Sequence, residues 1–230
     1  MSILRRISMD GTFNQNKPLL NLIPAKHCFS FDLKSATDRF PLSFLCKIMQ
    51  CMFGCDFASS VVNSTLAFNF FHVPFVKRKS STVCFVAGQP LGYYSSWPLF
   101  SLAHHILIWW CADQVKPGIK FRQYAVLGDD VLITDPDVAK VYEKSLSDLG
   151  VAINYQKSLI SDCGAAEFGK RFRYDMLKED LSPISIRSLL NSYHPFGLVA
   201  IADKYNIKRF STLARIGGAG FKTTHTSEGV

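Results

Sequence analysis

The chain has 230 residues, enough for one substantial hydrophobic core. Its net charge of +8 favours a phosphate-rich partner such as nucleic acid, although the same charge also suits binding to an anionic membrane or simply keeps a protein soluble. Seven cysteines without a secretory signal predict free, mostly buried thiols in a reducing compartment, and the spacing of Cys51 and Cys55 argues against a zinc knuckle.

The first part of the chain predicts a strand, a helix and a hairpin. Residues 27–33 mix aromatic and apolar side chains, as a short buried strand does, and residues 35–54 continue as a helical segment with Pro41 in its first turn or at a bend. Residues 69–88 predict two strands joined by a basic turn, in which "VKRK" (76–79) is expected to be solvated.

The longest apolar stretch, residues 97–112, is shorter than the ~20 residues that span a bilayer, so no membrane span is expected. It predicts a buried helix in which His104 and His105 are core residues rather than metal ligands. Residues 121–135 predict a strand pair, and residues 135–150 predict a helix with Asp at its start and Gly at its end. Further strands are expected over 151–174 and short helices over 175–230.

This order of elements predicts an α+β fold, in which an antiparallel sheet is covered by helices on one face. Such a sheet can bring Asp32, at the end of an early strand, beside Asp129 from a later hairpin.

The most informative stretch is "YAVLGDDVLI" (124–133), where Asp129 and Asp130 interrupt an apolar run. Burying two adjacent carboxylates costs several kcal/mol without compensation, so a divalent metal or a solvent-exposed hairpin tip would explain them. Nucleotidyl transfer needs two or three carboxylates that converge on metal ions. Asp32, Asp129 and the adjacent Asp130 are the candidates.

Asp38 follows Asp32 by six residues in "FDLKSATDRF". A helix that begins after Asp32 would direct Asp38 back towards a nucleotide sugar. "SATD" is equally typical of a helix N-cap, so both interpretations stay open.

Five motifs in order resemble the palm motifs of the RNA-directed RNA polymerases of mitoviruses and their narnavirus relatives: "FDLKSATDRFP", "GQPLGYYSSWPLFSLAHH", "YAVLGDDVLITD", "INYQKS" and "AEFGKRFRY". "MDGTFNQNKPL" before them and "LARIGGAGF" after them also look mitoviral, so the resemblance covers about residues 9–221. It implies a right-hand polymerase palm over 27–174, preceded by a remnant segment (1–26) and followed by a short thumb-like helical region (175–230).

The resemblance also implies residue roles. Asp32 would bind two Mg²⁺ (or Mn²⁺) ions, Asp129 would bridge them, and Asp130 would be a weaker or indirect ligand. Lys157 would protonate the departing pyrophosphate, although a solvated lysine at a strand end is the alternative. The residues implied to contact the ribose and the rest of the nucleotide are Asp38, Gly88, Gln89, Gly92, Ser95 and Ser96. Lys170 or Arg171 would contact the RNA backbone, but not both, since adjacent strand residues cannot both face one side.

The partners implied are an RNA template, an RNA product and ribonucleoside triphosphates. A fingers region normally precedes the first palm aspartate, and residues 1–31 are too short for one. The chain therefore looks like an N-terminally truncated copy resident in a plant mitochondrial or nuclear genome, and a mitochondrial location follows from that resemblance alone.

The truncation leaves two main hypotheses, an active RNA polymerase and a non-catalytic relic that at most binds RNA. Reverse transcription is a third, but Asp38 after "SAT" and Gly128 before the aspartate pair resemble the RNA polymerases. A metal-dependent nuclease or a merely structural domain would leave the serine, glycine and lysine motifs unexplained.

Overall fold

The computed structural model describes residues 1–22, 24–67, 69–74, 81–85, 87–90, 92–174, 179–205 and 207–218, without the side chains of 65–67, 81 and 179. Contacts divide the chain into two compact units, Met1–Leu181 and Ser182–Val230. The first unit holds every predicted site residue.

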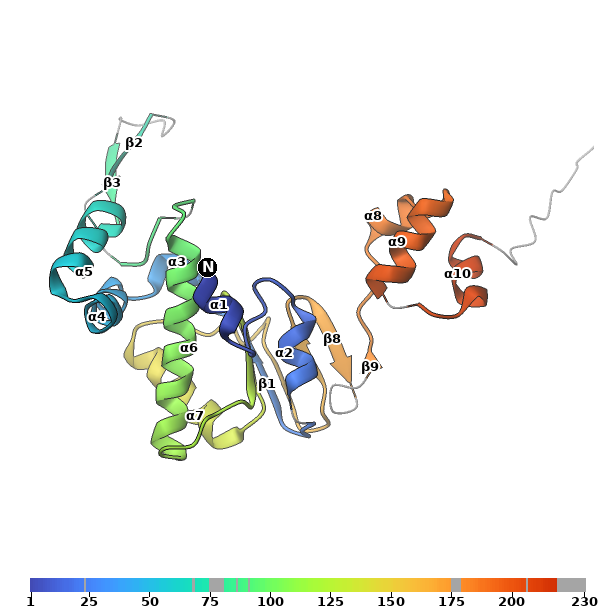
Figure 1. Cartoon of the computed structure of the whole chain (residues 1–230), viewed down its shortest axis with the longest axis horizontal. Helices are drawn as coiled ribbons and strands as arrows, with labels where there is room; N and C mark the ends of the chain where they lie inside the picture. Colours follow the sequence, from blue (N-terminus) through green and yellow to red (C-terminus); the bar gives the residue numbers. More distant parts are fainter. Residues whose placement is uncertain are drawn as a thin grey trace, which may run out of the picture. The chain divides into compact units, whose positions relative to one another are not determined.

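A four-stranded antiparallel sheet lies at the centre of the first unit, in the order β4-β5-β1-β6 (Figure 1). Its strands are rich in Val, Ile, Leu and Phe, which suit a buried pleated surface: β1 (Cys28–Phe31), β4 (Tyr124–Leu127), β5 (Asp130–Ile133) and β6 (Leu159–Ser161). The expected hairpin at 121–135 is therefore confirmed, whereas much of the expected strand before residue 159 is loop and turn.

Two helices pack together on one face of this sheet: α6 (Ser96–Val115) and α7 (Pro136–Asp148). Asp135 caps α7 by accepting hydrogen bonds from the backbone N–H groups of Asp137 and Val138, as the sequence predicted. The α+β expectation is confirmed, and His104 and His105 of α6 are fully buried, as expected.

The predicted helical segment 35–54 is two helices, α3 (Ala36–Arg39) and α4 (Leu42–Phe53), because Pro41 takes an extended conformation between them. Next come α5 (Cys55–Val61), a π-helix η1 (Val62–Ala67) and an antiparallel pair, β2 (Phe70–Val73) with β3 (Ser81–Cys84). The basic turn 76–79 lies outside the described residues.

The other face of the central sheet carries a smaller core, formed by α2 (Asn16–Asn21) and β7 (Ala166–Phe168) against β1, β4 and β5. β7 continues into β8 (Arg171–Tyr174) and β9 (Glu179–Asp180) as a three-stranded sheet. The N-terminal helix α1 (Ser2–Arg6) leads into a short bridge in which Asp10 runs parallel to Val126 of β4.

The second unit contains α8 (Ile186–Leu190), α9 (Pro195–Tyr205) and α10 (Phe210–Ile216). Within it the Tyr205 hydroxyl accepts a hydrogen bond from the backbone N–H of Ser185. Its thumb-like character stays a prediction. Among the described residues of both units, we find no helix with the length and apolar character needed to cross a bilayer.

The cysteines depart from expectation. All seven are free, but only Cys28 and Cys111 are buried. Cys51 lies in the last turn of α4 and Cys55 begins α5, and both side chains are exposed. The apolar character of a thiol therefore did not predict whether each cysteine is buried.

Candidate active site

The register of the central sheet brings Asp32 and Asp130 together. Phe31 of β1 pairs with Val131 of β5 in antiparallel register, so the next positions towards the β4–β5 turn are Asp32 and Asp130. Asp129 lies beside them in the two-residue turn between Leu127 and Asp130. The expected proximity of the three aspartates follows directly from this pairing.

A cavity of about 500 Å³ opens at this point. Its lining comes from β1, β5, the turn before β6, and the β7–β8 hairpin: Ser30, Phe31, Asp32, Asp130, Val131, Gln156, Lys157, Ser158, Leu159, Glu167, Lys170 and Phe172. We call this the catalytic cavity, after the role proposed for it below. Asp32, Asp130 and Lys157 thus share one space, while Asp129 stands at its edge, outside the lining.

Asp130 is electrostatically strained. Burial, together with the negative charges of Asp129, Asp32 and Glu167, raises its pKa from 3.8 to about 6, and Lys170 partly offsets this. A carboxyl placed among other carboxyls in a half-buried cavity favours the proton or a cation. The cavity is therefore a site where positive charge is stabilised.

The main chain around Asp32 is held by the segment that carries Lys157. The carbonyl of Asp32 accepts a hydrogen bond from the backbone N–H of Asn154 at 2.8 Å, and its N–H donates to the Ser158 hydroxyl at 3.1 Å. That hydroxyl in turn donates to the Asn154 carbonyl. Lys157 lies on this turn, exposed at the mouth of the catalytic cavity.

Gly128 is required by the β4–β5 turn in two ways. Its φ of +62° belongs to the left-handed region, and a Cβ there would lie 2.1 Å from the indole of Trp97. Its carbonyl accepts a hydrogen bond from Nδ1 of His104 at 2.7 Å. The aspartate turn is thus fixed against the first half of α6.

His104 holds the turn as a neutral ring. Its burial lowers the pKa from 6.5 to about 4. Because a carbonyl can only accept, Nδ1 carries the proton towards Gly128, and Nε2 accepts from the Tyr142 hydroxyl at 2.6 Å. The pair of histidines gave no signal of this role in the sequence beyond their place in an apolar helix.

The loop before α6 packs against the segment that carries Asp38. The backbone N–H of Gln89 donates to the Thr37 carbonyl at 2.8 Å, and that of Gly88 donates to the Phe40 carbonyl at 3.0 Å. Gly88 has a φ of +72°, and a Cβ there would lie 2.3 Å from the Thr37 oxygen. The two motifs are therefore in close backbone contact.

The predicted nucleotide residues divide by exposure. Gln89 and Ser96 are buried, and Nε2 of Gln89 donates to the Ser96 carbonyl while its Oε1 has no partner among the described residues. Gly92 is exposed with a φ of +95°, and Ser95 is half-buried at the start of α6. These four residues lie outside the lining of the catalytic cavity.

Asp38 is exposed on α3 and also lies outside that lining. Ser35 occupies the N-cap position of α3 with a φ of +51°, but its hydroxyl caps no backbone N–H. The geometry of "SATD" is therefore not that of a side-chain cap.

The two basic residues of the β7–β8 hairpin that were predicted to contact RNA, Lys170 and Arg171, have different surroundings. Lys170, with a φ of +60°, lines the catalytic cavity, whereas Arg171 lies 3.6 Å from the carboxylate of Asp180. Glu167, which was not among the predicted site residues, also lines the cavity, and its backbone N–H donates to the Ser30 hydroxyl. The buried neighbours Ala166 and Phe168 would have placed Glu167 on the opposite face of the strand.

The donor chemistry of the catalytic cavity suits a hard divalent cation, since Asp32, Asp130 and Glu167 offer carboxylate oxygens. Within the described residues, however, no three acidic, histidine or cysteine side chains form a group compact enough to hold a metal ion. Mg²⁺ is usually held by one or two carboxylates together with water and substrate phosphate oxygens, so a site of three protein ligands is not a precondition for its binding.

Solved structures with a similar fold are polymerases. Telomerase from Candida albicans in complex with a fragment of telomeric RNA aligns with a TM-score of 0.60 at 13% identity, over 87% of this chain and 41% of that one. Apo telomerase from Candida tropicalis aligns with a TM-score of 0.53, also at 13% identity, over 79% of this chain and 36% of that one. At these identities the similarity concerns the fold.

Sequence relatives are more specific. An uncharacterized mitochondrial protein of Arabidopsis thaliana is 65% identical over 158 residues, which are 68% of this chain and 78% of the relative. A second one is 43% identical over 96% of this chain and 90% of its own length. The RNA-directed RNA polymerase of Cryphonectria parasitica mitovirus 1 is 33% identical over 74% of this chain, which spans 21% of the viral protein.

The family model of the mitovirus RNA-dependent RNA polymerase matches residues 1–212, nearly the whole chain. The motifs that suggested this resemblance include the aspartates of the central sheet and the lysine at the mouth of the catalytic cavity. The chain therefore belongs to the mitovirus RNA-dependent RNA polymerase family.

Proposed function

We propose that the chain is a polymerase palm that extends an RNA 3′ end with ribonucleotides on an RNA template. The observation that carries this proposal is the catalytic cavity, in which Asp32 and Asp130 face Lys157 with Asp129 at the edge. A palm needs this arrangement because phosphoryl transfer depends on positioning and on neutralising charge.

Asp32, Asp129 and Asp130 would hold two Mg²⁺ (or Mn²⁺) ions, which supply charge neutralisation on the reacting phosphate and activation of the attacking hydroxyl. The raised pKa of Asp130 supports this role, because a cation would remove the repulsion that now favours its protonated form. Glu167, on the same wall, adds a further carboxylate.

Lys157 would donate a proton to the departing pyrophosphate and attract the triphosphate before that. Its position on a turn tied to the backbone of Asp32 supports this role, because the turn places an exposed ammonium at the mouth of the cavity. Lys170, in the same cavity, would contact an RNA phosphate. Arg171 is held by Asp180 and is the weaker candidate for that contact.

Asp38 would recognise the ribose 2′-hydroxyl, with Gly88, Gln89, Gly92 and Ser95 or Ser96 forming the adjoining nucleotide-binding loop. The backbone contacts between this loop and the Asp38 segment support a joint role. The partners are then template RNA, product RNA and ribonucleoside triphosphates. We also propose a mitochondrial location, since its relatives in Arabidopsis are described as mitochondrial proteins.

The test is primer extension on a short RNA template with ribonucleotides and Mg²⁺, comparing the purified chain with Asp129→Asn. Incorporation by the natural sequence that is lost in the folded variant supports the proposal. Equal incorporation by both proteins would refute it, and deoxyribonucleotides in a parallel reaction distinguish RNA synthesis from reverse transcription.

A second function, RNA binding without catalysis, is favoured by one specific observation: the described acidic side chains form no compact metal-binding group. In that case RNA binding would be sensitive to salt and unchanged in Asp129→Asn, with no nucleotide incorporation. Measuring Kd for a labelled RNA with both proteins, beside the extension assay, separates the two functions.

A further inference from the structure

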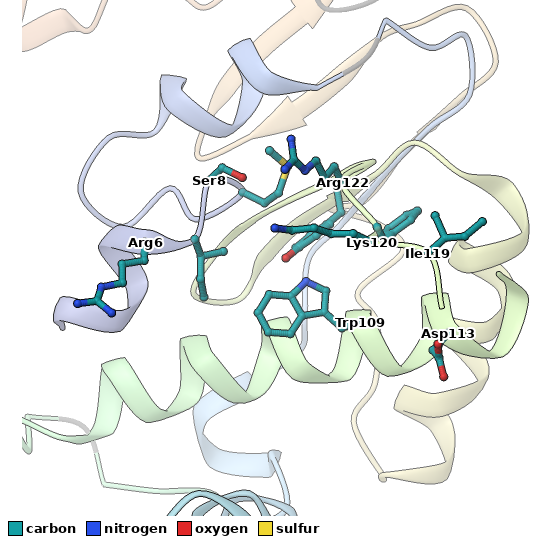
Figure 2. Close-up of a pocket in the computed structure, with 11 residues that line it drawn as sticks. Arg6, Ser8, Trp109, Asp113, Ile119, Lys120 and Arg122 are labelled. Carbon is teal, nitrogen blue, oxygen red and sulfur yellow. The ribbon is translucent and has the colours of Figure 1, made fainter. Parts of the chain in front are cut away.

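A second cavity lies away from the catalytic cavity. It has a volume of about 550 Å³ and opens between α1 with the residues after it, the second half of α6, and the segment that leads into β4 (Figure 2). No predicted site residue lines it. We call it the Trp109 cavity, because the indole of Trp109 forms its floor in this view.

The Trp109 ring is fixed by a chain of buried groups. The Asp10 carboxylate accepts from Nε2 of His105 at 3.0 Å, and Nδ1 of that ring lies 3.0 Å from the Tyr124 hydroxyl. The Trp109 ring packs beside this His105 ring, with centroids 5.8 Å apart and an interplanar angle of 30°. One side of the indole is therefore packed against a buried ring that is itself held at both nitrogens.

Trp109 is 39% exposed and lines the cavity, so part of its ring stays accessible although one side packs against His105. An immobilised aromatic face with free area is a suitable platform for stacking a planar ring, since little side-chain entropy remains to be lost on binding. The chain of buried groups therefore accounts for the orientation of Trp109 but not for its exposure.

Three cations line this cavity. Figure 2 shows Lys120 and Arg122 on the wall opposite Trp109, and Arg6 on α1 with its guanidinium directed away from the ring. None of the three has an ion-pair partner among the described residues. Asp113, the acidic residue of the lining, already accepts from the backbone N–H of Gly118 at 3.0 Å. The cavity thus combines an excess of positive charge, three cations against the Asp113 carboxylate, with an accessible aromatic side chain.

We propose that the Trp109 cavity binds one nucleotide of single-stranded RNA, separately from the catalytic cavity. The base stacks on Trp109, and the flanking phosphates approach Arg122 and Lys120, with Arg6 at the rim. Single-stranded RNA suits the site better than a duplex, because a paired base has no free face to stack on a side chain. The site gives affinity without sequence information, because a ring face and phosphates are common to all nucleotides.

The test is fluorescence anisotropy of a labelled hexa-riboadenylate in EDTA, so that neither metal nor catalysis contributes. Trp109→Leu is expected to weaken binding about tenfold, and Trp109→Phe, which keeps an aromatic face, to bind within about threefold of the natural sequence. Trp110→Leu is the matched control, since Trp110 is 53% exposed on the same helix but lines a different pocket. Arg122→Gln should lower the slope of log K against log salt by about 0.7.

Equal losses in Trp109→Leu and Trp110→Leu would overturn the proposal, as would an unchanged Kd in a Trp109→Leu protein whose circular dichroism shows it folded. Loss of binding in Lys157→Ala with retention in Trp109→Leu would place the RNA in the catalytic cavity instead. Because the assay involves no nucleotide addition, an inactive polymerase leaves this outcome interpretable.

Discussion

The repulsion among the carboxylates of the catalytic cavity makes a prediction about stability. Replacing Asp130 with Asn removes a charge that the folded state tolerates poorly. A rise in pKa from 3.8 to about 6 corresponds to roughly 3 kcal/mol of cost for ionising the folded protein. Because the carboxyl is only half-buried, solvent screening reduces this to about 1 kcal/mol.

The pH window follows from the same values. The folded state holds the Asp130 proton more tightly than the unfolded chain, so the cost is absent below about pH 4, grows as pH rises, and is complete above about pH 6. At pH 8 and without metal, Asp130→Asn should therefore raise Tm by about 2–4 °C, and at pH 4 the two proteins should melt together.

The assay is thermal unfolding followed by circular dichroism in EDTA at both pH values. Asp162→Asn, which removes an exposed acid from the turn after β6, is the control and should change Tm little at either pH. A Tm of Asp130→Asn at pH 8 equal to or below that of the natural sequence would refute the reasoning.

Two further changes test how the site is held. Gly88→Ala should destabilise the fold by about 2 kcal/mol or more in urea unfolding, because its Cβ would lie 2.3 Å from the Thr37 oxygen. Gly118→Ala is the control: it has the same φ of +72° but open space around it, so it should cost about 1 kcal/mol. Equal losses of stability in the two variants would contradict the role of packing at Gly88. His104→Leu leaves the Gly128 carbonyl without its donor and should cost about 2–4 kcal/mol. The natural sequence should lose stability as pH falls from about 6.5 to 4, because its neutral His104 resists protonation, and the same pH dependence in the variant would contradict this.

Much of the catalytic cavity could be predicted because its residues follow local patterns. Apolar runs on both sides of Asp129 and Asp130 predict the hairpin, and an antiparallel partner strand ending at Asp32 brings the carboxylates together. The N-terminal cap at Asp135 is likewise local, since it depends on residues two and three positions away.

What could not be predicted depends on contacts between distant segments. Glu167 lines the cavity because β7 packs against β1, and no local sequence pattern specifies this contact between two sheets. Asp10 meets His105 only because the N-terminal segment adds to the edge of β4. The helix at 35–54 divides at Pro41, whose extended conformation the sequence allowed but did not require.

Asp32 and Asp130 in the catalytic cavity, with Asp129 at its edge, are proposed to form a divalent metal site. Mn²⁺ binding, followed by the loss of the free-ion signal in electron paramagnetic resonance, tests this without template or substrate. We expect binding by the natural sequence and by Asp162→Asn, and a loss of affinity of about tenfold or more in Asp32→Asn and Asp129→Asn. No binding by the folded natural sequence, or binding unaffected by these two substitutions, would contradict it.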